Sequence, residues 1–300
     1  MVVASVLGDQ ELLGTMKLIM TLLVRDAENI LRENLEFHIQ QGVDFFIITD
    51  NRSGDGTSRI IEEYVAAGLA ERIWEPEDTF SQGRWVTRMA RRAATVHRAD
   101  WVINSDDDEF WSASSGSLND LLSRLPCEYS AVEVLRRNHP PLSAPASEHF
   151  LSSMVYRERR SRNVLGEPLP PKIIHRAFAD IEVDQGNHSV RRSGVTLATQ
   201  PTDTIAISHF PIRDFPSFER RIINGGAAYE RNTELGPGVG ATWRWLYALW
   251  REGGLKAWYD RQLLEPDQIT EGLADATLIR DESVLRAVGP GRGDRCNRAE

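Results

Sequence analysis

Hydrophobic and polar positions alternate in blocks along the first 112 residues of the chain. Apolar runs of strand length occupy residues 17–24, 44–50, 71–76 and 100–106, and segments with apolar residues at helical spacing lie between them, at 27–43, 57–69 and 81–99. Strands that alternate with helices in this way are typical of βαβ units, whose strands lie parallel in one sheet. The pattern predicts an α/β fold with a mostly parallel central sheet flanked by helices.

After residue 112 the alternation becomes irregular. Strands are expected at 130–137, 171–178 and 204–210, a hairpin at 181–190, helices at 117–125, 216–232 and 241–254, and a loop at 138–154. We interpret residues 17–112 and 113–265 as two halves of one domain, the second with a mixed arrangement of strands. Residues 1–16 are expected to be a flexible leader. Residues 266–300 are expected to be a C-terminal extension whose Gly- and Arg-rich end is disordered.

Composition narrows the class of protein. The formal charge of -9 excludes broad nucleic-acid binding, which depends on clustered Lys and Arg. The two cysteines, Cys127 and Cys296, have neither disulfide nor zinc spacing, which fits a reducing compartment. The chain shows no secretory signal and no apolar run long enough to span a bilayer. These features predict a cytoplasmic protein without a transmembrane segment, and they leave contact with the inner face of the membrane open.

The segment DNRSGDGT, residues 50–57, follows the second predicted strand. Read from Asn51, it has the spacing of a calcium loop, but such a loop follows a helix and this one follows a strand. In an open α/β sheet, ligands bind beyond the carboxyl ends of the strands, so Asp50 is placed to contact a ribose or a base. The other interpretation is a simple helix cap made by Asp55 or Thr57.

The segment WVINSDDDEFW, residues 101–111, follows the fourth predicted strand with four consecutive acids. Two unit charges 4 Å apart interact by about 1 kcal/mol in water and about 4 kcal/mol at an effective dielectric of about 20. Four carboxylates fixed between apolar residues therefore favour a bound divalent cation over a solvated, capped turn. Side chains alternate along an extended segment, so Asp106 and Asp108 face the same way and Asp107 does not. Carboxylate oxygens suit Mg²⁺ or Mn²⁺.

Together these motifs resemble the inverting family 2 glycosyltransferases of GT-A fold. The two segments that carry the resemblance are DNRSGDGT (50–57) and DWVINSDDDEFW (100–111). It continues in VRDAENILRENLEFHIQQGVD (24–44), KIIHR (172–176), GNHSV (186–190) and HFPIRDFPSFERRIINGG (209–226), so that it covers roughly residues 17–260. It implies a GT-A type nucleotide-sugar-binding fold whose C-terminal part lies on the acceptor side.

The resemblance also implies roles for individual residues. Asp106 and Asp108 would be the outer members of a DxD motif that holds Mn²⁺ or Mg²⁺ on the donor diphosphate, with His209 as a further metal ligand. The remaining residues expected to bind substrate are Arg25, Asp26, Asp50, Asn51, Asp55 and Asp107 on the donor side, Arg88 near a phosphate, and Lys172 and His175 towards the acceptor.

The reaction implied is the metal-dependent, inverting transfer of a sugar from a nucleotide-sugar, with UDP as the expected nucleotide, to an acceptor hydroxyl. A carboxylate or imidazole on the acceptor side would remove the acceptor proton. Asp184 and then His188 are the expected catalytic residues; Asp214 ranks behind them because it also fits a helix N-cap. The acceptor would be a carbohydrate or glycolipid, in surface-glycan or cell-envelope assembly.

Other functions fit the same acids. A nucleotidyltransferase or a phosphohydrolase would also use them for a metal, and a non-catalytic protein could bind a nucleotide-sugar on the same scaffold. The tryptophan-rich helix at 241–254 likewise has two interpretations. Its apolar residues at helical spacing favour core packing, and a sugar platform or a membrane-surface contact is the alternative.

Overall fold

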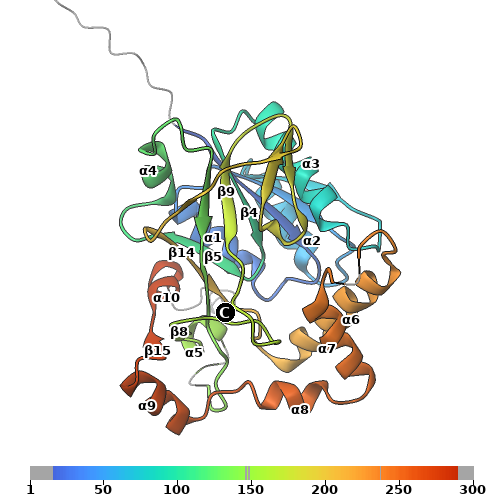
Figure 1. Cartoon of the computed structure of the whole chain (residues 1–300), viewed down its shortest axis with the longest axis vertical. Coiled ribbons are helices and arrows are strands. Elements are labelled where there is room, and N and C mark those ends of the chain that lie inside the picture. The colour runs from blue at the N-terminus through green and yellow to red at the C-terminus, as the bar shows by residue number, and fades with distance from the viewer. Residues whose placement is uncertain (1–15, 146, 148, 237, 290–300) are drawn as a thin grey trace, which may run out of the picture.

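The computed structural model describes residues 16–145, 147, 149–236 and 238–289, and in these residues a seven-stranded sheet forms the centre of the molecule (Figure 1). The flexible leader predicted at 1–16 lies outside the described residues except for Met16, and the C-terminal end predicted to be disordered lies outside them from residue 290. In spatial order the strands are β13 (Gln200–Pro201), β6 (Ala131–Val134), β9 (Lys172–Arg176), β4 (Trp101–Asp106), β1 (Leu18–Val24), β2 (Phe45–Asp50) and β3 (Ala70–Trp74). β9 runs antiparallel to both of its neighbours, and the other pairs are parallel. The predicted α/β class with a mostly parallel sheet is confirmed.

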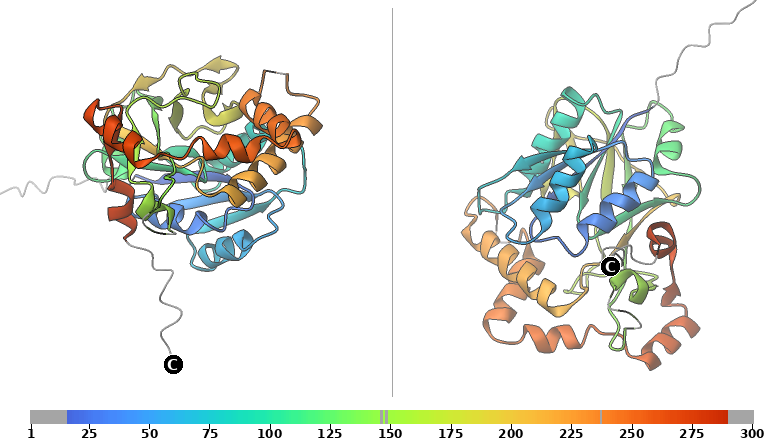
Figure 2. Two further views of the ribbon diagram at one scale, coloured as in Figure 1. Left: turned by 90° about the horizontal axis from the view of Figure 1, so that it is seen from below. Right: turned by 180° about the vertical axis from the view of Figure 1, so that it is seen from behind.

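Helices cover both faces of this sheet. α1 (Leu31–Gln40) and α2 (Thr57–Ala66) contribute to the apolar core on one face, and α3 (Gln82–Thr95) to the core on the other. Seen from behind, α1 and α2 lie in front of the strands (Figure 2). The core-facing residues of α3, among them Val86, Met89 and Ala93, recur every three or four positions and are fully buried. The periodicity read from the sequence thus places each helix against the sheet.

A second, three-stranded sheet lies beside the first. It consists of β5 (Glu109–Ala113), β14 (Ile205–His209) and β7 (Arg136–Asn138), with β14 in the middle. The single strand predicted at 130–137 is therefore wrong in detail, because the chain leaves the main sheet at Leu135, whose side chain is exposed, and continues as β7. This arrangement brings the ends of β4 and β14 together, since Phe210 N–H donates to the Asp108 carbonyl at 2.9 Å.

The remaining elements surround these sheets. A small antiparallel sheet holds β10 (Ile181–Val183), β11 (Val190–Arg192) and β12 (Val195–Thr196), as the predicted hairpin implies, and β8 (Tyr156–Glu158) pairs with β15 (Leu278–Arg280). The other helices are α4 (Leu118–Ser123), α5 (Phe150–Ser153), α6 (Phe215–Arg231), α7 (Ala241–Arg251), α8 (Leu255–Asp260), α9 (Pro266–Ala274) and α10 (Ser283–Val288). In Figure 1, α6 to α9 lie below the main sheet. None of the helices in the described part of the chain combines the length and apolar character needed to cross a lipid bilayer.

Two glycines set the close packing of α6 against α7. A Cβ atom on Gly225 would lie 2.6 Å from the Trp243 ring, and one on Gly226 would lie 2.3 Å from the Tyr247 Cβ. A larger residue at either position would push the helices apart. The tryptophan-rich helix therefore packs against α6, which is the packing interpretation of its sequence.

Candidate active site

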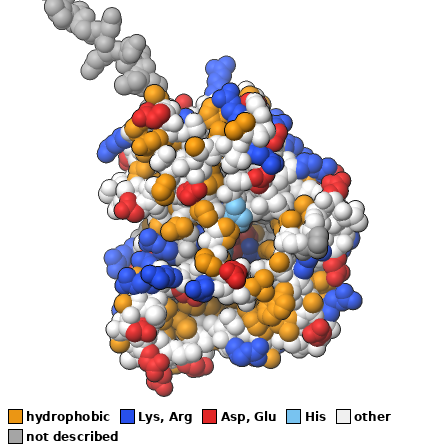
Figure 3. Space-filling model, in the orientation of Figure 1, with side chains coloured by type: hydrophobic (Ala, Val, Ile, Leu, Met, Phe, Trp, Pro, Cys, Tyr) orange, Lys and Arg blue, Asp and Glu red, His pale blue; other side chains and the backbone are white. Residues whose placement is uncertain are grey.

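A cavity of about 1050 Å³ lies where the carboxyl ends of the central strands face the C-terminal helices. Residues that follow β1, β2 and β4 form one wall, and α6, α7 and the segment before β9 form another. The surface is hollowed in this region of the molecule (Figure 3). Because parallel strands present their carboxyl ends at the same edge, residues far apart in the sequence converge here.

The acid turn, residues 106–109, is held in shape by helix α1. The side-chain amide of Asn34 donates to the backbone carbonyls of Asp107 at 3.0 Å and Glu109 at 2.9 Å. The buried imidazole of His38 accepts a hydrogen bond from the Trp111 N–H at 3.0 Å. These polar residues of α1 satisfy backbone groups that the turn leaves unpaired, so the acids begin from a fixed backbone.

Lys172 on β9 neutralises one side of the acid turn. Its ammonium group, only 1% exposed, lies 2.7 Å from Asp106 and 3.1 Å from Glu109. Arg136 approaches the same Glu109 oxygen at 3.7 Å. Burial by itself would raise the pKa of Asp106, but Lys172 outweighs it and keeps that pKa below its usual value. Glu109 differs, because burial raises its pKa to about 7 despite Lys172.

Arg221 on α6 neutralises the other side. Its guanidinium donates to Asp108, which is fully buried, and lies 3.9 Å from Asp107. Burial by itself would raise the pKa of Asp108, but Arg221 and His209 outweigh it and hold that pKa well below its usual range. Burial raises the pKa of Asp107 to about 6, against the lowering effect of Arg221. Asp106 and Asp108 are therefore the carboxylates of this turn whose charged forms are stabilised, while Asp107 is still mostly ionised at neutral pH and Glu109 is only partly so.

These ion pairs correct one step of the sequence argument. The acids were expected to need a bound metal to offset their repulsion, but lysine and arginine side chains of the protein itself supply that positive charge. In the described part of the chain, no group of three His, Cys, Asp or Glu side chains is arranged to hold a metal ion. The repulsion between the acids is thus no evidence for a metal.

Two donor atoms beside the turn nevertheless suit a divalent cation. The Oδ1 atom of Asp108 is buried and has no hydrogen-bond partner among the described residues. The Nε2 atom of His209 lies 3.6 Å from the other Asp108 oxygen, while its Nδ1 is hydrogen-bonded to Asn138 at 2.7 Å. A carboxylate oxygen and an oriented imidazole nitrogen are suitable metal ligands. The structure therefore brings Asp108 and His209 together, as expected for these two residues.

Asp50, at the end of β2, occupies a different environment from the one predicted. It is fully buried and does not line the cavity. One carboxylate oxygen accepts the Ser53 N–H at 3.0 Å, and the other accepts the Ser58 hydroxyl at 2.6 Å and the Arg72 guanidinium at 2.7 Å. With both oxygens engaged, Asp50 stabilises the turn, and the geometry does not favour contact with a nucleotide.

Three other donor-side candidates also lie off the cavity. Asp26 accepts hydrogen bonds from the Gly54 N–H at 2.7 Å and the Asn224 amide at 2.8 Å, and Asp55 accepts the Thr57 N–H at 2.9 Å. The Asp55 contact lies at the start of α2, although the N-cap residue Gly56 makes no side-chain cap, and Asp26 joins the DNRSGDGT segment to α6. Arg88 is 45% exposed and pairs with Glu75 at 3.0 Å instead of facing the cavity.

Arg25 and Asn51 do line the cavity. The Arg25 guanidinium pairs with Asp78 at 2.7 Å, and the Asn51 side chain donates to the carbonyls of Glu75 and Glu77 at 3.1 and 2.6 Å. Both residues are therefore held in defined positions at the wall formed by the strand ends.

The expected catalytic residues Asp184 and His188 both border the cavity. The Asp184 carboxylate is already engaged, by the Ser189 hydroxyl and by Arg191 at 2.7 Å. The Nδ1 atom of His188 is hydrogen-bonded to the Pro171 carbonyl at 2.8 Å, which leaves Nε2 as the nitrogen with the free lone pair. Burial lowers the pKa of His188 to about 4, so this imidazole is neutral at physiological pH.

His175 and Asp214 have structural partners. His175 is fully buried within the sheet, where its Nε2 pairs with the Asn104 amide at 2.9 Å, and it does not line the cavity. An acceptor contact for His175 is not favoured, because its side chain is buried against Asn104 of the neighbouring strand β4. Asp214 caps α6 by accepting the Ser217 N–H at 2.8 Å, as its helix-cap interpretation predicts.

Several cavity residues escaped the sequence analysis. Arg221 carries no local signal, because its partner Asp108 lies 113 positions away. Gln82, which donates to Asp106 at 3.0 Å, looks like an ordinary first-turn residue of α3. Glu158 borders the cavity, but in the sequence it stands among arginines that are typical of a solvated loop. The sequence shows the arginine-rich segment, but it does not show the pairing of β8 with β15 that places Glu158 in the cavity wall.

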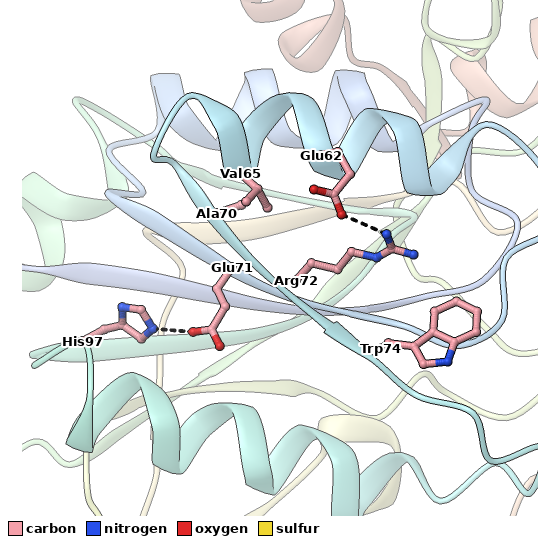
Figure 4. A pocket seen from close by; sticks show the side chains of 7 residues that line it. All are labelled: Glu62, Val65, Ala70, Glu71, Arg72, Trp74 and His97. Carbon is pink, nitrogen blue, oxygen red and sulfur yellow. Dashed lines mark hydrogen bonds and ion pairs between the residues drawn. The ribbon is translucent and has the colours of Figure 1, made fainter.

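A second hollow, of about 660 Å³, lies at the outer edge of β3. Its ionisable side chains are paired with one another, Glu62 with Arg72 at 2.9 Å and Glu71 with His97 at 2.7 Å (Figure 4). No residue of the acid turn reaches it. This hollow is therefore not the candidate active site.

Comparison with protein families identifies the family of this chain. The model of glycosyltransferase family 92 matches residues 20–179, a segment that contains the acid turn and Lys172. The chain belongs to glycosyltransferase family 92. For this family 92 chain, the predicted glycosyltransferase class is confirmed, whereas the resemblance to family 2 is not. The match does not support the nucleotidyltransferase or phosphohydrolase alternatives. No curated protein sequence matches the chain.

Solved structures of glycosyltransferases show distant likeness to the chain. One is residues 1–349 of S. aureus TarS in complex with UDP-GlcNAc, at 12% sequence identity over 74% of this chain and 68% of that chain, with a TM-score of 0.42. Another is the mannosyltransferase PcManGT from Pyrobaculum calidifontis in complex with GDP-Man and Mn²⁺, at 13% identity over 91% of this chain and 85% of that chain, with a TM-score of 0.37.

Proposed function

We propose that this protein transfers a sugar from a nucleotide-sugar, with UDP as the expected nucleotide, to an acceptor hydroxyl with inversion at the anomeric carbon. The observation that carries the proposal is the acid turn of a family 92 chain, bordering a cavity at the carboxyl ends of β1, β2 and β4. Nucleotide ligands of open α/β sheets bind at this edge. A GT-A type arrangement follows from the same sheet, in which β9 is the antiparallel strand.

The donor would occupy the wall formed by the strand ends. Arg25 and Asn51 line that wall and are held by their own partners, so they can contact the nucleoside without reorganising. Asp106 and Asp107 also line the cavity. Lys172 keeps Asp106 ionised and places a buried positive charge within reach of a diphosphate.

The side-chain atoms at the acid turn would suit a divalent cation, Mn²⁺ or Mg²⁺. Asp108 and His209 offer an unpartnered carboxylate oxygen and an oriented imidazole nitrogen, and Asp106 is the neighbouring charged carboxylate. When bound, the cation would offset the charge that develops on the leaving diphosphate. Arg221 on α6 keeps the Asp108 carboxylate ionised and fixes its position. Asp108 is therefore ready to act as a ligand before a metal binds.

The acceptor would enter from the side of α6, α7 and the segment before β9. Many residues there are apolar, among them Leu169, Ile222 and Leu246, so a carbohydrate or glycolipid acceptor with an apolar portion would be accommodated. We place the reaction in surface-glycan or cell-envelope assembly, with contact at the inner face of a membrane.

Calorimetry with UDP, GDP, CDP and ADP, each with Mn²⁺ and again with EDTA, tests this proposal. We expect one nucleotide to bind, and we expect its affinity to fall at least about 10-fold with EDTA and with Asp108→Asn, which removes a charged ligand. Asp203→Asn is the matched control, because that aspartate is exposed and does not line the cavity. Binding of none of the four nucleotides, or equal affinity in every condition, would contradict the proposal.

A further inference from the structure

Glu158 is an acid of the cavity wall that lies outside the acid turn. It is the last residue of β8, and its register partner on β15 is Leu278; both side chains line the cavity. The Oε2 atom of Glu158 is buried and has no hydrogen-bond partner in the described part of the chain. Such an unpartnered buried oxygen is costly unless a ligand satisfies it.

The segment that follows Glu158 is held by the three-stranded sheet of β5, β14 and β7. Strand β7 pairs with β14 so that Asn138 lies opposite His209, and the Asn138 side chain accepts a hydrogen bond from His209 at 2.7 Å. The Asn138 backbone N–H donates to the Ser161 hydroxyl at 2.7 Å, and its side chain donates to the Arg162 carbonyl at 3.1 Å. Asn138 therefore ties the segment that follows Glu158 to the histidine beside the acid turn.

The other acids of the cavity have cationic partners that Glu158 lacks among the described residues. Among the described residues, the carboxylates that border the cavity are those of Asp106, Asp107, Asp108, Glu158 and Asp184. Lys172 and Arg221 lie against the acid turn, and Arg191 with Ser189 holds Asp184. Within the same residues no ion pair involves Glu158. Among these residues, its carboxylate is thus the one that no cation neutralises, although the Ser161 and Asn138 side chains and the Arg162 N–H lie close enough to lower its pKa in part.

The surroundings of Glu158 favour the uptake of a proton. Its register partner Leu278 is a buried apolar residue that lines the cavity beside it. Burial raises the pKa of Glu158 above its usual value, so its basicity exceeds that of an exposed glutamate. A base works best when its pKa lies nearer to the working pH.

We propose that Glu158 is the general base that removes the proton from the acceptor hydroxyl, an inference that rests on the proposed function. The acceptor oxygen forms a bond to the anomeric carbon as its proton passes to the Glu158 carboxylate. The bond between the anomeric carbon and the diphosphate oxygen breaks, and its electron pair leaves with the nucleoside diphosphate. Glu158 then releases the proton to solvent, so no oxidant or other co-reactant is needed.

The test uses the full chain with water as the acceptor. Release of nucleotide from UDP-glucose, UDP-galactose, UDP-GlcNAc and GDP-mannose is measured for the wild type, Glu158→Gln and Glu158→Asp, together with the affinity for the nucleotide diphosphate. We expect Glu158→Gln to lose about 100-fold or more in turnover while nucleotide affinity changes less than about twofold. We expect Glu158→Asp to retain an intermediate rate. Glu167→Gln is the control, because this exposed glutamate follows in the same segment but does not line the cavity.

Two results separate the inference from the proposed function. If the wild type and Glu158→Gln are equally active, the assignment of Glu158 is wrong while the proposed function stands; loss of turnover in His188→Gln or Asp184→Asn would then identify the base. If the wild type binds no nucleotide and acts on none of the donors, the proposed function fails and the assignment falls with it. Circular dichroism of each variant confirms that loss of turnover is not loss of folding.

Discussion

The turns that follow β2 and β4 begin alike and end in different roles. Each starts with an aspartate at the carboxyl end of a buried strand, and β1 lies between the two strands. In the β2 turn, Asp50 binds Ser53 and Ser58, close by in the sequence, and Arg72 on the adjacent strand β3. In the β4 turn, Asp106 pairs with Lys172 and Asp108 pairs with Arg221, which lie 66 and 113 positions away in the sequence. Acids that cap their own turn stabilise it, whereas acids that meet distant cations in a cavity form a site.

Replacing Arg221 has the largest expected effect on stability. Arg221→Met leaves Asp108 buried and charged with only His209 nearby, at 3.6 Å. An uncompensated buried charge costs about 3–5 kcal/mol, so we expect the free energy of unfolding to fall by that amount. Urea denaturation measures it.

A double variant sharpens this prediction. Asp108→Asn together with Arg221→Met removes both charges, so we expect much of the lost stability to return, with a coupling energy above about 1 kcal/mol between the two sites. Losses that simply add would mean that Arg221 and Asp108 do not depend on each other, and the contrast between the two turns would weaken.

Asp50→Asn should separate the turns in the opposite way. The substitution weakens the contacts to Arg72 and Ser58 but leaves the cavity wall intact. We expect the free energy of unfolding to fall by about 1–3 kcal/mol, as for a disturbed buried hydrogen-bond partner, and nucleotide affinity per folded molecule to stay within about twofold. Loss of nucleotide affinity without loss of stability would place Asp50 in the donor pocket after all.

Arg88→Ala has the smallest expected effect. Arg88 is 45% exposed, and among the described residues it pairs with Glu75. Pairs of this kind contribute about 1 kcal/mol or less, and we expect neither stability nor nucleotide affinity to change beyond that. A marked fall in nucleotide affinity on titration would show that Arg88 reaches a phosphate, as the sequence analysis expected.

The sequence predicted the central architecture because its signals are local. Apolar runs and helical spacing are properties of neighbouring residues, and they place β1, β2, β4 and the helices between them correctly. The same reasoning placed the acid turn at a strand end. It missed the break at Leu135, because one exposed leucine inside an apolar run does not announce a change of sheet.

The site was harder to predict because its contacts are long-range. The positive charges of Lys172 and Arg221 look like ordinary surface charges until β9 and α6 bring them to the acid turn. Asp184 follows a predicted strand well beyond the acid turn, but the sequence does not reveal that Arg191 and Ser189 engage its carboxylate. Likewise, nothing in the strand pattern distinguishes Asp50, buried in its own turn, from an acid that faces a ligand.

The acid turn is held by residues from two distant parts of the chain, and this has a consequence for its assembly during synthesis. Helix α1 shapes the turn soon after the chain begins, but the guanidinium that steadies it comes from α6, near residue 221. During synthesis, a nascent chain that has emerged only as far as β9 carries the acids without Arg221. A chain that ended before α6 would therefore lack the Arg221 contact to Asp108, so the acid turn reaches its final electrostatic state only after residue 221 has been synthesised.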